Sequence, residues 1–204
     1  SLWGTRFLPL IIGIDEKGDV MIYIDGAHAV HTDCKGHSGL HVTMGTGSML
    51  SVSKKLGLNT NSSTETEVVS TGERMSKCTW FRYFRIAQGD VAKEDLLHQD
   101  NQSAMILEKN HPFSVGKGSK HIHIRYFFVT DKIAKKEVKL IYCPTKDMIA
   151  DYNTKPLQGA QFIRFRNLML GIKAEDFHNY KRLYKKILQK YELWDEHEKE
   201  LEFV

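Results

Sequence analysis

The sequence has 204 residues, 41% of them hydrophobic and 26% charged, and its 29 basic and 25 acidic residues give a formal charge of +4. This composition supports one domain of roughly 130 to 170 residues with extensions, excludes wholesale disorder, and permits a polyanionic partner without requiring one. The three cysteines cannot all be paired in disulfides, which favours a reducing, intracellular setting. The apolar segment 8–14 is too short for a membrane span and lacks the basic start of a signal peptide, so we expect no membrane partner.

The first predicted elements are three strands. Residues 20–25 place apolar side chains on both faces, which is typical of a central strand that is covered on both sides. Residues 39–45 and 47–53 are separated by Gly45 and Gly47 and are predicted as two strands in antiparallel turns.

A long helix is predicted next, from the S-x-x-E start pattern at Ser62 to about Gln88, where Gly89 ends it. The later predicted elements are a strand at 96–99, helices at 102–109 and 120–135, a strand at 137–143, and helices at 145–154 and 158–170. Three strands followed by alternating helices and strands predict an α/β fold with a mixed sheet and helices on both faces.

The end of the chain has a different composition. Charged residues dominate from about residue 174, and apolar residues keep a spacing of three or four, which predicts an amphipathic helix. These residues are Phe177, Tyr180, Tyr184, Ile187, Tyr191, Trp194 and Leu201. We therefore divide the chain into a main domain at 1–172 and a charged C-terminal helix at 173–204.

Four acidic residues stand in apolar surroundings. Asp25 and Asp100 end predicted strands, Glu67 lies near the start of the long helix, and Asp151 lies in an otherwise apolar helix. Adjacent central strands could bring Asp25 and Asp100 together, and close carboxylates repel each other unless a hard cation bridges them. Two such cations would form a site for phosphodiester cleavage. The alternative, that these acids are turn residues and solvated helix positions, stays open on spacing alone because the chain has 25 acids.

Five segments in order resemble the ribonuclease H domain of copia-type LTR retrotransposons, which follows the reverse transcriptase in the Pol polyprotein. They are residues 23–25 (YID), 62–67 (SSTETE), 99–104 (QDNQSA), 120–126 (KHIHIRY), and 150–151 (AD) with 154–157 (TKPL). The resemblance covers residues 5 to 172 and implies a ribonuclease H-like fold with a five-stranded mixed sheet.

The resemblance also implies a function. Asp25, Glu67, Asp100 and Asp151 would bind two Mg²⁺ ions, for which Mn²⁺ can substitute, and would cleave the RNA strand of RNA–DNA hybrids beside the reverse transcriptase domain. The expected setting is a cytoplasmic virus-like particle or the nucleus. One alternative is an inactive remnant that acts as a structural or nucleic-acid-binding module. Another is an integrase-like nuclease, but those sites commonly have a D-D-E order, whereas the acids here run D-E-D-D.

Several polar and basic residues are expected to contact nucleic acid without reading its sequence. They are Lys54, Lys55, Asn101, Gln102, Lys120 and Arg125. For each lysine alone, a solvated surface charge is the simpler interpretation.

The two glutamates at the start of the long helix cannot both face the sheet, because residues two apart point about 200° from each other. Ser62 with Glu65 and Thr64 with Glu67 both fit the capping pattern, so helical periodicity leaves the choice open. The resemblance matches Glu67 to the metal-binding glutamate.

Two further groups favour structural roles. Trp80, Phe81, Tyr83 and Phe84 are expected in the core rather than stacked on bases. A second group could ligate zinc, but it lacks the tight cysteine pairs of structural zinc sites and suits a turn-rich link between strands better. This group comprises His28, His31, Cys34, His37 and His41.

Overall fold

The computed structural model describes residues 7–91, 93–109 and 120–190, with residues 120–126 and Leu188 described by their helical backbone alone. A five-stranded sheet in the order β5-β3-β2-β6-β7 forms its centre. Its strands are β2 (Met21–Ala27), β3 (His37–Thr43), β5 (Leu50–Lys55), β6 (Asp95–Gln99) and β7 (Val138–Tyr142). The sheet is mixed, because β2 pairs antiparallel with β3 and parallel with β6. A second, two-stranded sheet joins β1 (Gly13–Ile14) to β4 (Gly45–Thr46).

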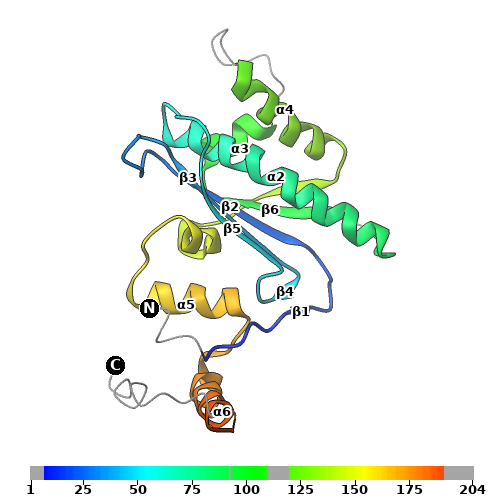
Figure 1. Ribbon diagram of the computed structural model, residues 1–204. Helices are drawn as coiled ribbons and strands as arrows, with labels where there is room; N and C mark the ends of the chain where they lie inside the picture. Colours follow the sequence, from blue (N-terminus) through cyan, green and yellow to red (C-terminus); the bar gives the residue numbers. More distant parts are fainter. Residues whose placement is uncertain (1–6, 92, 110–119, 191–204) are drawn as a thin grey trace.

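Helices cover both faces of the five-stranded sheet (Figure 1). One face carries α2 (Ser63–Ala87), α3 (Gln102–Lys109) and α4 (Lys120–Ala134). The other face carries the 3-10 helix η3 (Ile149–Asn153) and α5 (Gly159–Leu170), with α6 (Phe177–Lys190) beyond α5. The predicted α/β class, with a five-stranded mixed sheet and helices on both faces, is confirmed. Within the described residues, no helix is both long and apolar enough to cross a membrane.

The central strand β2 forms the middle of the core. Ile22 and Ile24 are 1% and 0% exposed, and they belong to a cluster that includes Leu40 and Leu97 from the neighbouring strands. Met75 of α2 belongs to the same cluster. Burial of one such side chain contributes about 1.5 to 3 kcal/mol, so the apolar sequence of β2 explains its central place.

Helix α2 begins as predicted. Ser62 is the N-cap, and its hydroxyl accepts a hydrogen bond from the Glu65 amide at 3.1 Å. The Glu65 carboxylate turns back and accepts from the Asn61 amide at 2.6 Å. Glu65 therefore stabilises the start of the helix, and the helix ends at Ala87, with Gln88 as its C-cap before Gly89, whose φ is 90°.

Three predicted elements are displaced or of another type in the structure, whereas the other predicted strands and helices up to residue 170 differ by at most two residues at an end. The strands expected at 39–45 and 47–53 are β3 and β5, displaced because residues 45–46 pair with β1 instead. The single helix expected at 145–154 is wrong. That segment forms two 3-10 helices, η2 (Thr145–Asp147) and η3, because Met148 between them has φ −74° and ψ 89°. The Met148 side chain is fully buried beside Cys143, which favours this extended residue over a continuous helix.

The end of the chain is helical as far as it is described. A short 3-10 helix, η4 (Ala174–Asp176), leads into α6. Tyr191, Trp194 and Leu201 of the predicted apolar stripe lie outside the described residues. The division of the chain between residues 172 and 173 stays a prediction.

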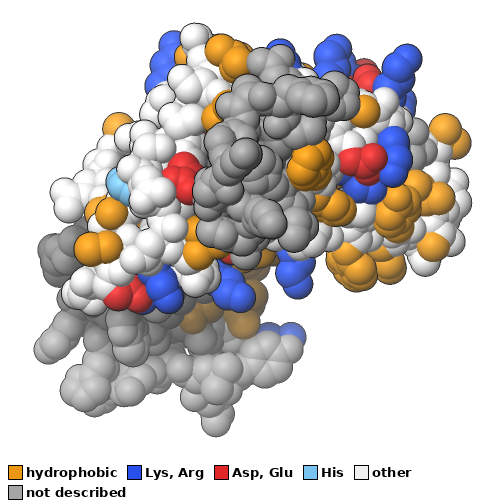
Figure 2. Space-filling view, turned by 90° about the horizontal axis from the view of Figure 1, so that it is seen from above, with side chains coloured by type: hydrophobic (Ala, Val, Ile, Leu, Met, Phe, Trp, Pro, Cys, Tyr) orange, Lys and Arg blue, Asp and Glu red, His pale blue; other side chains and the backbone are white. Residues whose placement is uncertain are grey.

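The aromatic residues of α2 were expected in the core, and for most of them that prediction is wrong. Phe81 is buried, but the side chains of Trp80, Tyr83 and Phe84 are 60%, 50% and 49% exposed. Trp80 and Phe84 stack on each other at 5.5 Å between ring centroids. Figure 2 shows hydrophobic side chains gathered at the right-hand end of the molecule, where α2 ends. A spacing of four residues places Trp80 and Phe84 on the same side of α2, and their exposure shows that this side is not covered by the sheet.

A buried carboxyl group lies between the helices of this layer. Glu108 of α3 is 0% exposed, and neither of its carboxyl oxygens has a hydrogen-bond partner of ordinary length among the described residues. Burial raises the pKa of Glu108 to about 8, and the Thr71 hydroxyl opposes this rise only in part. The folded protein therefore keeps this group protonated at neutral pH, because an isolated buried carboxylate is costly.

We expect Glu108→Gln to stabilise the protein at pH 8 by roughly 2 to 4 kcal/mol. The unfolded chain loses the Glu108 proton above its ordinary pKa of 4.5, whereas the folded protein holds it to about pH 8. The free energy of unfolding should therefore fall between pH 5 and pH 8 in the native chain, and less steeply in the variant. Urea unfolding at pH 5, 6.5 and 8 measures this difference. Glu94→Gln, at an exposed position, is the control, and an equal pH slope in native chain and Glu108→Gln would contradict the prediction.

Candidate active site

Two parallel strands bring Asp25 and Asp100 side by side. Tyr23 of β2 is paired with His98 of β6, so the same register two residues further on aligns Asp25 with Asp100. Asp100 directly follows β6, as predicted, whereas Asp25 lies inside β2 rather than at its end. The strand continues to Ala27 because β3 still pairs with it there.

Helix α2 adds a third carboxylate. One carboxylate oxygen from each of Asp25, Glu67 and Asp100 lies within 4.8 Å of the other two. Glu67 is 6% exposed, while Glu65 is engaged at the helix start. This is the only group of three or more acidic, histidine or cysteine residues at such spacing in the described parts of the chain.

Two glycines allow this close approach. A Cβ on Gly26 would lie 2.9 Å from the Thr66 carbonyl oxygen, so the missing side chain lets α2 pack tightly beside Asp25. Gly39 is the partner of Asp25 across the β2–β3 ladder, and a Cβ there would lie 2.7 Å from the Ala150 carbonyl oxygen. Gly39 therefore lets η3 pack against the opposite face of the sheet.

Helix η3 and the residues after it complete the site. Asp151 is 2% exposed, and the Lys155 ammonium lies 2.7 Å from its Oδ1 atom and 3.4 Å from Asp25 Oδ1. The Thr154 hydroxyl donates a short hydrogen bond to Asp25 Oδ2. Lys155 thus links Asp151 to the cluster of Asp25, Glu67 and Asp100, and its positive charge partly offsets the charge of these carboxylates.

A second set of hydrogen bonds holds Asp100. The Thr145 hydroxyl donates to Asp100 Oδ2 at 3.0 Å. The buried Gln99 side chain accepts from the Asp100 and Asn101 amides at 2.9 and 3.1 Å, and it donates to the Thr71 hydroxyl at 3.5 Å. The turn after β6 is therefore tied to α2, the helix that carries Glu67.

The electrostatics of the site are those of crowded carboxylates. Burial, followed by the charges of Asp25 and Asp100, raises the pKa of Glu67 well above its ordinary value. Burial and then Asp25 raise the pKa of Asp100, and the same two causes raise the pKa of Asp151 to about 6. Burial lowers the pKa of Lys155, but Asp25 and Asp151 more than offset this, so the net shift is upward. The site therefore has an excess of negative charge that one lysine does not neutralise.

These residues fit divalent cations. Glu67 Oε2 is buried without a hydrogen-bond partner among the described residues, although it lies in the cluster with Asp25 and Asp100. A buried carboxylate oxygen without a partner is costly, and a bound cation would satisfy it. Carboxylate oxygens are also the ligands that Mg²⁺ and Ca²⁺ prefer.

Sequence reasoning did not identify Lys155, Thr154, Thr145 and Gln99 as site residues. Lys155 had a usable signal, because it stands four residues after Asp151 and just outside an apolar turn. The two threonines had none, because their contacts with Asp25 and Asp100 span 129 and 45 residues of sequence.

We expect Lys155→Met to lower stability by about 1 kcal/mol in the absence of metal, the upper end of the range for a partly exposed ion pair. The carboxylates would then repel each other without their lysine counter-ion. Added Mg²⁺ should restore more stability to this variant than to the native chain. Thermal unfolding with and without Mg²⁺ measures both effects, with the exposed Lys146→Met as control. A Lys155→Met protein as stable as the native chain without metal would contradict this role.

The residues predicted to contact nucleic acid differ in their exposure and in the contacts that their side chains make. The Asn101 side chain caps α3 by accepting from the Ala104 amide at 3.0 Å, which gives it a structural task. Gln102 and Lys54 are exposed, and Lys55 pairs with Asp33 at 2.7 Å. For Lys120 and Arg125 the structure describes the helical backbone but not the side chains.

The histidine and cysteine group does not converge. His31 and His37 lie 3.0 Å apart between ring nitrogens, but His28 bonds to Thr66 and His41 to Ser48. Cys34, the remaining member of the group, is an exposed free cysteine. These separate contacts favour the turn-rich link over a zinc site.

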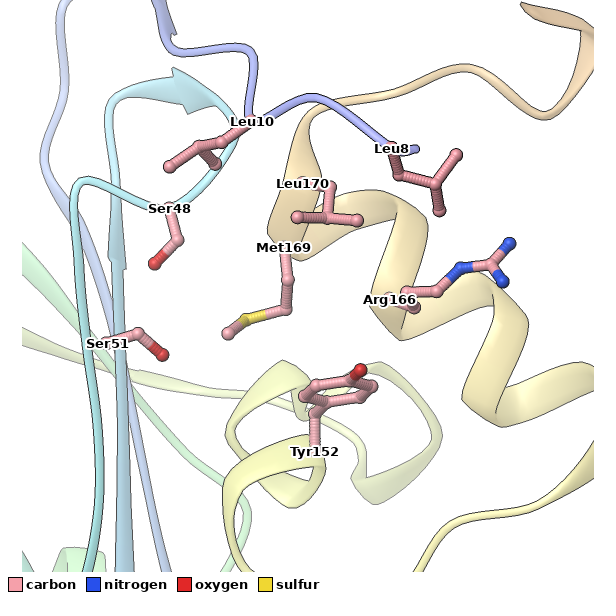
Figure 3. Close-up of a pocket in the computed structure, with 8 residues that line it drawn as sticks. All are labelled: Leu8, Leu10, Ser48, Ser51, Tyr152, Arg166, Met169 and Leu170. Carbon is pink, nitrogen blue, oxygen red and sulfur yellow. The ribbon is translucent and has the colours of Figure 1, made fainter. Parts of the chain in front are cut away.

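A pocket of about 460 Å³ lies between Tyr152 of η3 and Arg166 and Met169 of α5 (Figure 3). Its lining residues are Leu8, Leu10, Ser48, Ser51, Tyr152, Arg166, Met169 and Leu170. None of these residues is acidic, so this pocket does not extend the candidate metal site.

No protein-family profile matches the chain. Its curated relatives include the retrovirus-related Pol polyproteins from transposon TNT 1-94 of Nicotiana tabacum, 29% identical over 101 residues, and from transposon RE1 of Arabidopsis thaliana, 30% identical over 114 residues. The matches cover 50% and 55% of this chain but only 8% of each polyprotein.

Solved structures with a similar arrangement include LC11-RNase H1, isolated from compost by a metagenomic approach. It is 14% identical, with a TM-score of 0.49 over 67% of this chain and 93% of that chain. The same enzyme in complex with an RNA/DNA hybrid is 15% identical, with a TM-score of 0.48 over 67% and 94% of the two chains.

The strand order, the mixed strand directions and the acidic cluster beside the two central parallel strands define a mixed-sheet α/β protein with a candidate metal site. The sequence relatives agree with the resemblance stated above, because over about half of its length the chain is similar to retrovirus-related Pol polyproteins of plant transposons.

Proposed function

We propose that the chain is a divalent-metal-dependent ribonuclease H that cleaves the RNA strand of RNA–DNA hybrids. The strongest support is the cluster of Asp25, Glu67 and Asp100, in which one carboxylate oxygen of each residue lies within 4.8 Å of the other two. Lys155 pairs with both Asp25 and Asp151 and so links Asp151 to this cluster. A cluster with this excess of negative charge suits the binding of divalent cations. Its place near the carboxyl ends of the central strands β2 and β6 suits a substrate that approaches from that end of the sheet.

Asp25, Glu67, Asp100 and Asp151 would hold two divalent cations, whose chemistry would be the activation of a water molecule and the stabilisation of the leaving 3′ oxygen. The chain supplies the positioning. Asp25 and Asp100, at the centre, are oriented by Thr154 and Thr145. Glu67 and Asp151 complete the ligand set from α2 and η3. Because these carboxylates are largely buried, their oxygens are held in place before any ligand arrives.

The substrate would contact the chain mainly through its phosphates and 2′-hydroxyls. Lys54, Lys55 and Gln102 are accessible for such contacts, and we assign the same task to Lys120 and Arg125 from the sequence. The reaction would accompany reverse transcription, beside the reverse transcriptase domain of the same polyprotein, in a virus-like particle or the nucleus.

A cleavage assay on a labelled RNA–DNA hybrid, with single-stranded RNA and double-stranded DNA beside it, tests the proposal. Cleavage should require Mg²⁺ or Mn²⁺, should be confined to the hybrid, and should be lost in Asp25→Asn but kept in Asp33→Asn, at an exposed acid. Calcium should bind and raise the melting temperature but support little cleavage. Hybrid binding without cleavage under any of these metals would instead show an inactive nucleic-acid-binding remnant.

A further inference from the structure

Helix α6 carries a concentrated positive charge. Its 14 residues include five basic side chains and no acidic one. The basic residues are Lys181, Arg182, Lys185, Lys186 and Lys190. Their spacing of one and four places them along one side of the helix. The sequence that follows, residues 191–204, contains six acidic residues and one lysine, so the positive charge is confined to α6.

The opposite side of α6 is seated on the protein. The Phe177 ring meets the edge of the Phe7 ring at 5.0 Å, and Tyr184 lies 6.3 Å from the same ring. The Arg166 guanidinium of α5 lies over Phe177 at 5.2 Å. Because these aromatic contacts orient the helix, its basic side faces outward, and Arg182 and Lys186 are exposed.

Helix α6 is also connected to the candidate active site. It packs on α5 through Arg166, and α5 packs on η3 through stacked Phe162 and Tyr152 rings 5.5 Å apart. Figure 3 shows Tyr152 from η3 and Arg166 from α5 lining the same pocket. These two contacts place α6 one helix beyond α5, as seen from the η3 helix that carries Asp151. A nucleic-acid duplex advances about 34 Å per turn, which is the length scale on which a duplex at the site would extend toward α6.

We propose that the basic side of α6 binds the phosphate backbone of the hybrid, about one helical turn away from the cleavage position. This inference rests on the proposed function for the identity of the polyanion. The alternative binding partner for the basic side of α6 is an anionic membrane surface. Nucleic acid is favoured because the aromatic residues Phe177 and Tyr184 are packed against Phe7, which leaves, among the described side chains of the apolar side, only Leu183 and Ile187 exposed for insertion into a membrane.

The test compares binding of hybrids of about 8 and about 24 base pairs, less than one turn and more than two turns of duplex. Binding is followed by fluorescence anisotropy in Ca²⁺ at several salt concentrations. The variant combines Lys181→Gln, Arg182→Gln and Lys186→Gln, and the matched control combines Lys17→Gln, Lys77→Gln and Lys139→Gln, three exposed positions on other elements. Circular dichroism verifies that both variants are folded.

The α6 variant should bind the long hybrid roughly tenfold more weakly, with a salt slope lower by about 2 to 3, as expected for three lost phosphate contacts. Its affinity for the short hybrid and the affinities of the control should stay near native values. Equal losses in both variants, or equal losses for both hybrid lengths, would overturn the inference. So would binding to phosphatidylserine vesicles that depends on these residues while hybrid binding does not.

The readout separates this inference from the proposed function. A chain that shows the α6-dependent length effect but cleaves no hybrid in Mg²⁺ contradicts the nuclease proposal alone. A chain that cleaves hybrids while the α6 variant binds both lengths as the native protein does contradicts only the role of α6.

Discussion

Replacing Glu67 by glutamine is expected to lower hybrid cleavage by on the order of 10³-fold, the scale expected when one group that stabilises transition-state charge is removed. Stability without metal should hardly change, because Glu67 Oε2 already lacks a hydrogen-bond partner among the described residues and burial raises the pKa of the group. The rise in melting temperature caused by Mg²⁺ should shrink in the variant. Cleavage of a labelled hybrid and thermal unfolding measure these effects.

Glu65→Gln is the matched control on the same helix. Its carboxylate accepts from the Asn61 amide at the start of α2, so its loss should cost about 0.5 to 1 kcal/mol of stability and leave most of the activity. An inactive Glu65→Gln beside an active Glu67→Gln would mean that the wrong glutamate of the pair has been assigned to the metal.

Replacing Gly39 by alanine is expected to damage both the fold and the site. The added Cβ would lie 2.7 Å from the Ala150 carbonyl oxygen and 2.9 Å from Asn153 Cβ, so β3 and η3 must separate. Overpacking of this kind costs about 1 to 3 kcal/mol, and it would move Asp151 away from Asp25. Urea unfolding should show the loss of stability, and titration with Mg²⁺ should show weaker binding.

Gly57→Ala provides the comparison for that variant. An added Cβ at Gly57 would have Glu73 Oε1 as its nearest neighbour, at 3.9 Å, so no displacement is needed. Its stability and Mg²⁺ response should match those of the native chain. Native Mg²⁺ binding in Gly39→Ala would show that the close contact of β3 with η3 does not position Asp151.

The sequence predicts most of the sheet and the long helix because their signals are local. Apolar residues on both faces mark β2, and the cap formed by Ser62 with Glu65 marks the start of α2. The segment 145–154 could not be predicted from such signals. Its residues suit a helix, but the burial of Met148 and the contact with Gly39 favour two separate turns.

For the candidate site, the sequence identifies the acids but not what surrounds them. Asp25 and Asp100 stand out because charged residues are unusual beside apolar strands. The contribution of Thr154 depends on a contact across the sheet, for which no local pattern exists. The error over Trp80 and Phe84 has a related cause, because residue type shows that a side chain is hydrophobic but not whether this chain covers it.

The residues that surround Asp25 emerge from the ribosome in a particular order. Asp25, Glu67 and Asp100 are synthesised first, whereas Thr154 and Lys155 follow Asp25 by 129 and 130 residues. A growing chain therefore holds three carboxylates before the lysine that partly neutralises them exists. Premature termination or proteolysis ahead of η3 would leave a product with this uncompensated charge and without Asp151, so such a product would lack part of the candidate ligand set.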